Sequence, residues 1–328
     1  MLNNAAGYQV LALAAKDESD VTLFVHVWTS QQPVIQGWVH IMHGMSEHGA
    51  RYGETAQWFN ALGFHVSADD HRGHGLTGQG QAEQGHGNLG HMGDHNAWRK
   101  CLLDQTHIMQ TLAQQWSQPL FVLGHSMGSF MATQWVQEQS RQLPQLNSLI
   151  LSGSNYGAPW LFRIAAGIAA IERSRQGKQG RSTLLDKLSF GQFNSRIHPK
   201  RTPKDWLCTL PEVVDAYIAD PLAGQLISNQ FWFDFLHGLA DLSEPDAMLQ
   251  IRNDLPIYIF SGAMDPVGKY GKGIAALQKA LRLSGKTNVT CHVYPQGRHE
   301  MLNEVNKQQV RDDLAVWLAG LTGANAAV

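Results

Sequence analysis

A five-residue G-x-S-x-G pattern constrains the fold of this chain more than any other feature. Residues 124–128, with Ser126 at the centre, follow the apolar run 119–123 and precede the helical run 130–136. A serine on such a strand-turn-helix needs small neighbours, because a Cβ at either flank would collide with the adjoining strand or helix. Gly124 and Gly128 meet that need. The pattern therefore predicts that the serine hydroxyl projects above a sheet as a nucleophile.

A serine nucleophile needs a base and an acid, which in an α/β sheet follow it in the order acid, then histidine. The run 255–260 is typical of a buried parallel strand, and Asp265 lies in the loop after it. The next strand pattern, 289–294, is followed by a loop that contains His299. An imidazole accepts the serine proton, and a carboxylate fixes the imidazole tautomer. We therefore predict Ser126, Asp265 and His299 as the catalytic residues.

Acyl transfer also needs hydrogen-bond donors for the oxyanion. One donor is expected from the backbone N–H of Met127, the residue after the nucleophile. The strand pattern 34–42 ends at a glycine-containing loop that begins with His43 and Gly44, and the Met45 N–H of this loop is suited to be the second donor. We predict Met45 and Met127 as the oxyanion hole.

Three motifs, taken together, resemble those of the monoacylglycerol lipase and lysophospholipase branch of the α/β-hydrolases, which is grouped with the serine aminopeptidase-like hydrolases. They are residues 43–48 with Arg51 and Tyr52, residues 70–75, and residues 124–128. The resemblance runs over nearly the whole chain. It implies an esterase or lipase that acts on single-chain acyl lipids and needs no cofactor. The position of Met45 is usually small in that family, so the methionine predicts a narrower acyl channel.

Polar residues around the predicted oxyanion loop are expected to support it. Glu47, His48, Arg51 and Tyr52 combine a charged pair with two polar rings beside a turn, which favours a buried hydrogen-bonded cluster. The predicted supporting residues are His43, Gly44, Glu47, His48, Arg51 and His125.

Composition limits the remaining classes of protein. The chain has 328 residues, of which 43% are hydrophobic and 16% charged, and its net charge of −2 gives no indication of nucleic-acid binding. Three widely spaced cysteines without a C-x-x-C predict neither a disulfide framework nor a zinc site. The apolar stretch 10–15 is too short for a signal sequence or a membrane span, so we expect a cytoplasmic protein.

Two other kinds of pattern are not expected to bind ligands. Residues 73–78 and 85–90 both match G-x-G-x-x-G, but neither runs straight into an apolar helix, so we expect flexible loops and no dinucleotide site. His91 and His95 are four residues apart but lack the glutamate of a zinc helix and a nearby cysteine. No metal is therefore predicted.

Alternating strand and helix patterns predict an α/β-hydrolase fold, with a mostly parallel central sheet, flanking helices and an inserted helical cap. The expected strands are 23–28, 34–42, 64–68, 120–123, 146–152, 255–260 and 289–294. The expected core helices are 51–62, 96–116, 127–139, 271–283 and 305–318. Residues 155–247 carry no strand pattern. We therefore expect a core of residues 1–154 and 248–328 and a cap of residues 155–247.

The cap sequence is basic, with ten Lys and Arg residues against three Asp and Glu residues between Asn155 and Asp205. Together with the apolar helical run 160–171, this charge is compatible with transient contact to the inner membrane surface. The alternative is a cap helix packed over an acyl pocket with a solvated basic loop behind it. The aromatic residues of the cap either line that pocket or form the core of the cap.

The sequence thus predicts a serine hydrolase of carboxylic esters in single-chain acyl lipids, either monoacylglycerol or lysophospholipid, acting through an acyl-enzyme intermediate. A small-molecule carboxylesterase is the first alternative. An aminopeptidase-like amide hydrolase would need cap carboxylates to hold the substrate ammonium. The candidates for that role are Glu212, Asp215, Asp220 and Asp234. A hydrolase-like ligand receptor is disfavoured by the intact set of Ser126, Asp265 and His299.

Overall fold

The central element of the computed structural model, which describes residues 7–17 and 20–323, is an eight-stranded sheet. The strand order is β1-β2-β4-β3-β5-β6-β7-β8. β2 pairs antiparallel with β1 and with β4, and all other neighbours are parallel. The strands are β1 (Tyr8–Ala14), β2 (Thr22–Trp28), β3 (Gly37–Met42), β4 (Phe64–Asp69), β5 (Leu120–His125), β6 (Leu146–Ser152), β7 (Ile257–Gly262) and β8 (Val289–Tyr294). The predicted fold class is confirmed.

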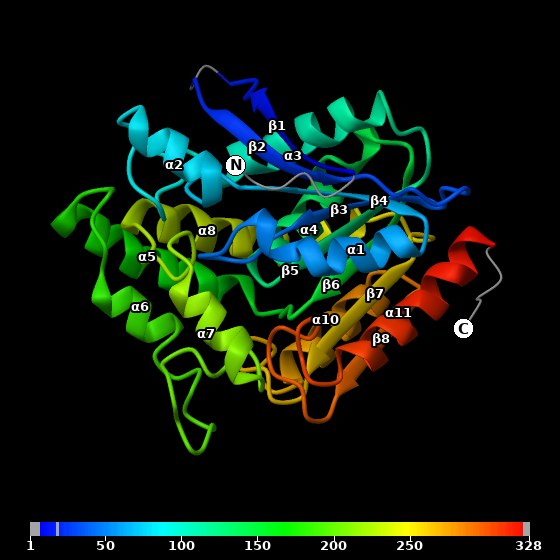
Figure 1. Cartoon of the computed structure of the whole chain (residues 1–328). Helices are drawn as coiled ribbons and strands as arrows, with labels where there is room; N and C mark the ends of the chain where they lie inside the picture. The colour runs from blue at the N-terminus through cyan, green and yellow to red at the C-terminus, as the bar shows by residue number, and fades with distance from the viewer. Residues whose placement is uncertain (1–6, 18–19, 324–328) are drawn as a thin grey trace.

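Helices cover both faces of this sheet (Figure 1). One apolar cluster joins the sheet to α1 and α11, and a second joins its other face to α3, α4 and α10. The helices outside the β6–β7 connection are α1 (Gly53–Ala61), α2 (Gly75–Glu83), α3 (Ala97–Ala113), α4 (Met127–Glu138), α10 (Lys272–Leu283) and α11 (Lys307–Thr322), with short 3₁₀ turns η1 (Gly49–Tyr52) and η2 (Ser140–Gln142).

The central strands β3 and β5 are buried along their whole length and carry mostly apolar residues, because helices cover both of their faces. On β3, Trp38 belongs to the cluster with α3 and α4, whereas Val39 and Ile41 belong to the cluster with α1 and α11. On β5, Val122 and Phe121 divide in the same way. Continuous apolar runs are typical of parallel strands covered on both sides. The carboxyl ends of these parallel strands consequently lie at one edge, where their loops meet.

Five helices lie between β6 and β7. They are α5 (Pro159–Gln176), α6 (Thr183–Ser189), α7 (Pro211–Ala219), α8 (Asn229–Leu242) and α9 (Pro245–Leu249). Residues 155–247 contain no strand, and α5 packs against α8, which packs in turn against α3 and α4 of the core. α9 crosses residue 248, so the boundary between cap and core stays a proposal. Among the described residues, no helix combines the length and apolar character needed to cross a membrane.

The structure contains one strand, β1, that no sequence pattern predicted. The structure also corrects the expectation that residues 73–78 form a flexible loop. Most of the glycine pattern lies in α2, where the Leu76 N–H donates to Asp70 Oδ2 at 2.7 Å and Thr77 Oγ1 accepts from the Phe24 N–H at 2.9 Å. A Cβ on Gly78 would lie 2.6 Å from the Gly73 carbonyl carbon. The glycines therefore permit close packing, and tertiary contacts outweigh their low helix propensity.

Candidate active site

The predicted nucleophile occupies a tight turn between β5 and α4. Ser126 has φ 53° and ψ −120°, a conformation that non-glycine residues rarely adopt. A Cβ on Gly124 would lie 2.3 Å from the Gly128 oxygen, and a Cβ on Gly128 would lie 1.9 Å from the Met42 oxygen. Both flanking positions therefore exclude any side chain. This turn places Ser126 at the carboxyl edge of the sheet.

Asp265 and His299 lie next to each other in loops that follow β7 and β8. The Nδ1 of His299 lies 3.0 Å from each carboxylate oxygen of Asp265, and both side chains are buried. The Asp265 carboxylate also accepts from the Ser261 hydroxyl at 3.0 Å and from the Val267 N–H at 2.8 Å. These contacts fix the carboxylate, which in turn orients the imidazole.

The two charges shift each other's pKa in the directions that a base and its orienting acid require. Burial raises the pKa of Asp265, but His299 and the hydrogen-bond donors lower it by more, so the net pKa lies below its usual value. Burial lowers the pKa of His299, but Asp265 raises it by more. The pair therefore favours an ionised carboxylate beside an imidazole that protonates readily.

Ser126 and His299 line the same cavity. The Ser126 hydroxyl forms no hydrogen bond within the described part of the chain, and catalytic contacts of this kind often tighten only when substrate binds. Gly153, at the end of β6, leaves space for the imidazole, because a Cβ there would lie 2.8 Å from His299 Cε1. Sequence reasoning missed Gly153, although its position directly after a predicted strand was a signal.

The predicted oxyanion loop passes close to the serine. A Cβ on Gly44 would lie 3.2 Å from Ser126 Cβ, so the loop approaches the nucleophile with its backbone. Met45 follows Gly44, and Met127 begins α4. Neither amide donates to an acceptor among the described residues, so both donors are available to a ligand. The arrangement suits the oxyanion role that we predict for them.

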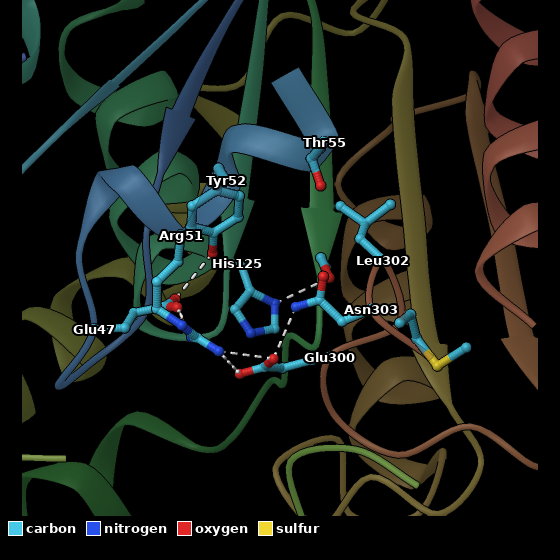
Figure 2. A pocket seen from close by; sticks show the side chains of 10 residues that line it. Glu47, Arg51, Tyr52, Thr55, His125, Glu300, Leu302 and Asn303 are labelled. Carbon is cyan, nitrogen blue, oxygen red and sulfur yellow. Dashed lines mark hydrogen bonds and ion pairs between the residues drawn. The ribbon is translucent and has the colours of Figure 1, made fainter. Parts of the chain in front are cut away.

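A buried ionic network supports this loop (Figure 2). Glu47 Oε1 accepts from the Gly44 N–H at 2.5 Å and from the Tyr52 hydroxyl at 2.9 Å, while Arg51 pairs with Glu47. The Arg51 Nη2 also donates to both Glu300 oxygens, at 3.0 and 3.1 Å. Burial raises the pKa of Glu47, but Arg51 and the other donors outweigh it and hold that pKa at about 2.

Arg51 thus joins the loop of the predicted oxyanion hole to the loop of the predicted base, because Glu300 directly follows His299. Sequence reasoning placed Glu47 and Arg51 in one cluster but missed Glu300. Its only signal was its position beside the histidine, because the pairing spans 249 residues of sequence.

Two of the supporting histidines, His43 and His125, are buried, and burial lowers the pKa of each. His43 stacks on His71 with ring centroids 3.8 Å apart, and its Nε2 accepts from the His71 N–H at 3.0 Å. Its Nδ1 therefore carries the hydrogen and donates to the Gly44 oxygen at 2.7 Å. Burial, together with the nearby His299, lowers the pKa of His125 to about 4. In the described ranges, no group of three or more His, Cys, Asp or Glu side chains could hold a metal ion.

Contacts from the cap hold the other end of the oxyanion loop. The Tyr217 hydroxyl donates to the Ser46 oxygen at 3.0 Å, and the Gly224 N–H donates to the same oxygen at 2.8 Å. His48 Nε2 lies 2.8 Å from Asp220 Oδ2. His48 therefore links the loop to the cap, as does Arg51, whose guanidinium lies 4.9 Å from the centre of the Tyr217 ring on α7.

Two cavities of different chemistry meet at Ser126. The first, called the polar cavity below, combines apolar side chains with charged and polar ones that include Glu47, Arg51 and His299. The second, called the apolar cavity below, is lined mainly by apolar side chains. Its lining side chains include Met45, Phe130, Phe162, Leu188, Phe193, Trp232, Phe235 and Leu239. Met45 borders both cavities, and the aromatic residues of the cap thus contribute to a cavity wall.

The four carboxylates considered for an aminopeptidase lie elsewhere. Asp215 pairs with Arg201, Asp220 with His48, and Asp234 accepts from the Ala97 N–H. None of Glu212, Asp215, Asp220 and Asp234 lines either cavity at Ser126 within the described structure. The carboxylates that do border the polar cavity are Glu47, Asp186 and Glu300.

A mostly parallel sheet with a serine on a tight turn after β5, and an acid and a histidine after β7 and β8, defines an α/β-hydrolase. Residues 33–306 match the family described as serine aminopeptidase, S33, and the chain belongs to this family. The predicted family is therefore confirmed, and the protein is a carboxylic ester hydrolase.

Similar proteins agree with this class. A monoacylglycerol lipase of Mycolicibacterium smegmatis is 26% identical over 91% of this chain and 93% of its own length. A monoglyceride lipase of Rattus norvegicus is 34% identical over 82% of this chain and 80% of its own length. The crystal structure of a thermostable carboxyl esterase from Bacillus coagulans superposes with a TM-score of 0.85 and 26% identity, covering 96% of this chain and 99% of the esterase.

Proposed function

We propose that this enzyme hydrolyses the ester bond of single-chain acyl lipids, such as monoacylglycerol or lysophospholipid, through an acyl-enzyme intermediate. The observation that carries the proposal is the meeting of an apolar and a polar cavity at Ser126. A cavity lined mainly by apolar side chains suits a hydrocarbon chain, and a cavity with charged and polar side chains suits an alcohol. The names of two relatives, a monoacylglycerol lipase and a monoglyceride lipase, support it.

In this mechanism, the Ser126 hydroxyl attacks the ester carbonyl while His299 accepts its proton. Asp265 keeps the imidazole in the required tautomer and stabilises its positive form. The Met45 and Met127 amides donate to the tetrahedral oxyanion. His299 then returns the proton to the departing alcohol oxygen, which leaves an acyl group on Ser126.

Water then hydrolyses the acyl-enzyme, with the same residues in the same roles. His299 accepts a proton from water, the resulting hydroxide adds to the acyl carbonyl, and the fatty acid departs as the proton returns to Ser126. Arg51 supports both halves of the site by holding Glu47 beside the oxyanion loop and Glu300 beside His299. The chain's own side chains and amides therefore account for each proton transfer.

We further propose that the cap brings this site to a lipid surface. Trp160, Ile164 and Ile171 on α5 and Leu188 on α6 are exposed, and Leu188 also borders the apolar cavity. Exposed apolar side chains in a basic segment favour contact with an anionic membrane. Acyl chains would then enter the apolar cavity from the side that faces the lipid.

Fatty-acid release from monoacylglycerol and lysophosphatidylcholine, beside a short-chain ester and with Ser126→Ala as the blank, tests the proposal. We expect long single-chain lipids to be preferred and all turnover to be lost in the blank. Turnover of the short ester alone would contradict the lipid substrate and favour a small-molecule carboxylesterase. Release of chromophore from an aminoacyl anilide would favour the aminopeptidase alternative.

A further inference from the structure

Within the described residues, two charged side chains in the polar cavity at Ser126 form no direct ion pair. Asp186, in the middle of α6, and Lys204, in the segment between α6 and α7, both line this cavity together with Ser126 and His299. Among residues 7–17 and 20–323, neither side chain forms a hydrogen bond or an ion pair, and the two do not pair with each other. The cavity thus contains one cation and one anion that are open to a ligand.

The other charges of this cavity are already compensated. Glu47 and Glu300 share Arg51, and their remaining oxygen contacts come from Gly44, Tyr52 and neutral neighbours. A ligand would displace these bonds only at a large cost, because buried ionic contacts are expensive to break. Recognition of a charged group in the cavity therefore depends on Asp186 and Lys204.

The surroundings of Lys204 favour an anionic partner. Its Nζ lies 5.7 Å from the centre of the Phe190 ring and 5.9 Å from that of Tyr217. Burial lowers the pKa of Lys204, and Asp186 opposes that shift only in part. A half-buried ammonium that donates to no acceptor gains most from a strong acceptor such as a phosphate oxygen.

We propose that Asp186 and Lys204 select the alcohol part of the ester, with Lys204 binding a phosphodiester and Asp186 binding an ammonium group on the same alcohol. This inference rests on the proposed function and names the substrate class of that site: zwitterionic lysophospholipid. Water cleaves the acyl ester bond and yields a fatty acid and a glycerophospho-alcohol, whereas the phosphodiester remains intact.

Other alcohols fit these charges less well. Glycerol would hydrogen-bond to both side chains but would leave each charge without a counter-ion. An anionic head group would satisfy Lys204 but would place its charge near Asp186, Glu47 and Glu300, which also border the cavity. A zwitterion complements both charges without adding net charge.

The test compares four esters with the same acyl chain in micelles of one nonionic detergent: monoacylglycerol, lysophosphatidylglycerol, lysophosphatidylethanolamine and lysophosphatidylcholine. We expect kcat/KM for the two zwitterions to exceed that for monoacylglycerol by about tenfold, the value of one charge-assisted contact. Lys204→Met should remove this preference. Asp186→Asn should lower it and should raise the relative rate on lysophosphatidylglycerol.

Lys187→Met is the matched control, because Lys187 adjoins Asp186 on α6 but is exposed and does not line the cavity. It should leave all four ratios unchanged. The rate of labelling by a fluorophosphonate probe reports whether each variant retains its active site.

Equal turnover of monoacylglycerol and the zwitterions, or a uniform loss on all four esters in Lys204→Met, would overturn the head-group assignment and leave the proposed function standing. An enzyme that labels with the probe but hydrolyses none of the four lipids would overturn both. The two failures are therefore distinguishable.

Discussion

The loops of the core and the helices of the β6–β7 insertion meet at Ser126, but their side chains differ in burial and in hydrogen bonding. In the core, the carboxylates of Asp265 and Glu47 are buried and held by several donors. In the insertion, Trp160 is exposed and the Lys204 ammonium forms no ion pair within residues 7–17 and 20–323. Groups that perform chemistry need a fixed geometry, whereas groups that meet varied substrates need access. We therefore propose that the core supplies the reaction and the insertion its selectivity.

The largest expected contrast is between two aspartates. Asp265→Asn should lower kcat by about 10³- to 10⁴-fold, because an amide no longer selects the tautomer of His299 that accepts the proton of Ser126. Asp215→Asn in the cap should leave kcat unchanged, since its carboxylate is exposed and pairs with Arg201. Steady-state turnover of a soluble ester measures both. A loss of less than tenfold in Asp265→Asn would contradict its assigned role.

A feature was predictable from the sequence when the residues that determine it lie close together along the chain. The turn at Ser126 was predictable because its requirement for Gly124 and Gly128 lies within five residues. Asp265 and His299 were predictable because each directly follows a strand pattern. These rules are local, and the structure places all these residues at one edge of the sheet.

Long-range contacts were not predictable in the same way. The pairing of Arg51 with Glu300, and the presence of Asp186 and Lys204 in one cavity, depend on how distant segments pack. α2 was missed because its glycines are disfavoured in helices by propensity alone, whereas contacts with Asp70 and β2 stabilise it. Local rules thus predicted most of the core and little of the detailed surface of the cap.

A second contrast compares a buried with an exposed ion pair. Arg51→Met should lower the free energy of unfolding by about 3 kcal/mol, because it leaves Glu47 and Glu300 buried without their shared cation. Arg163→Met breaks the exposed pair with Glu244 on the insertion and should change stability very little. Urea unfolding of both variants gives the comparison. Equal effects would show that the core network does not differ energetically from the exposed pair.

A smaller difference between the core and the insertion is expected in the pH dependence of activity. His299 must be neutral to accept a proton, so kcat/KM should fall as the pH drops through its pKa. Asp265, Glu300 and Glu47 raise this pKa against the effect of burial, so the acid limb should lie above the ordinary value of 6.5. A pH profile on a soluble ester measures it. An acid limb below 6.5 would contradict the assignment. Asp220→Asn removes a carboxylate that pairs with His48 but does not act on His299, so it should not move the acid limb.

The smallest expected effect concerns exposed apolar side chains of the two regions. Trp160 on α5 is 59% exposed and Val316 on α11 of the core is 58% exposed, so replacing either by serine should change stability by no more than about 0.5 kcal/mol. If α5 contacts lipid, Trp160→Ser should lower the hydrolysis of esters in anionic vesicles by a few-fold, leaving soluble-ester turnover intact, because one aromatic anchor is lost. Val316→Ser should affect neither rate. If both variants lost the same share of vesicle hydrolysis, or if neither lost any, the proposal that α5 contacts lipid would be contradicted.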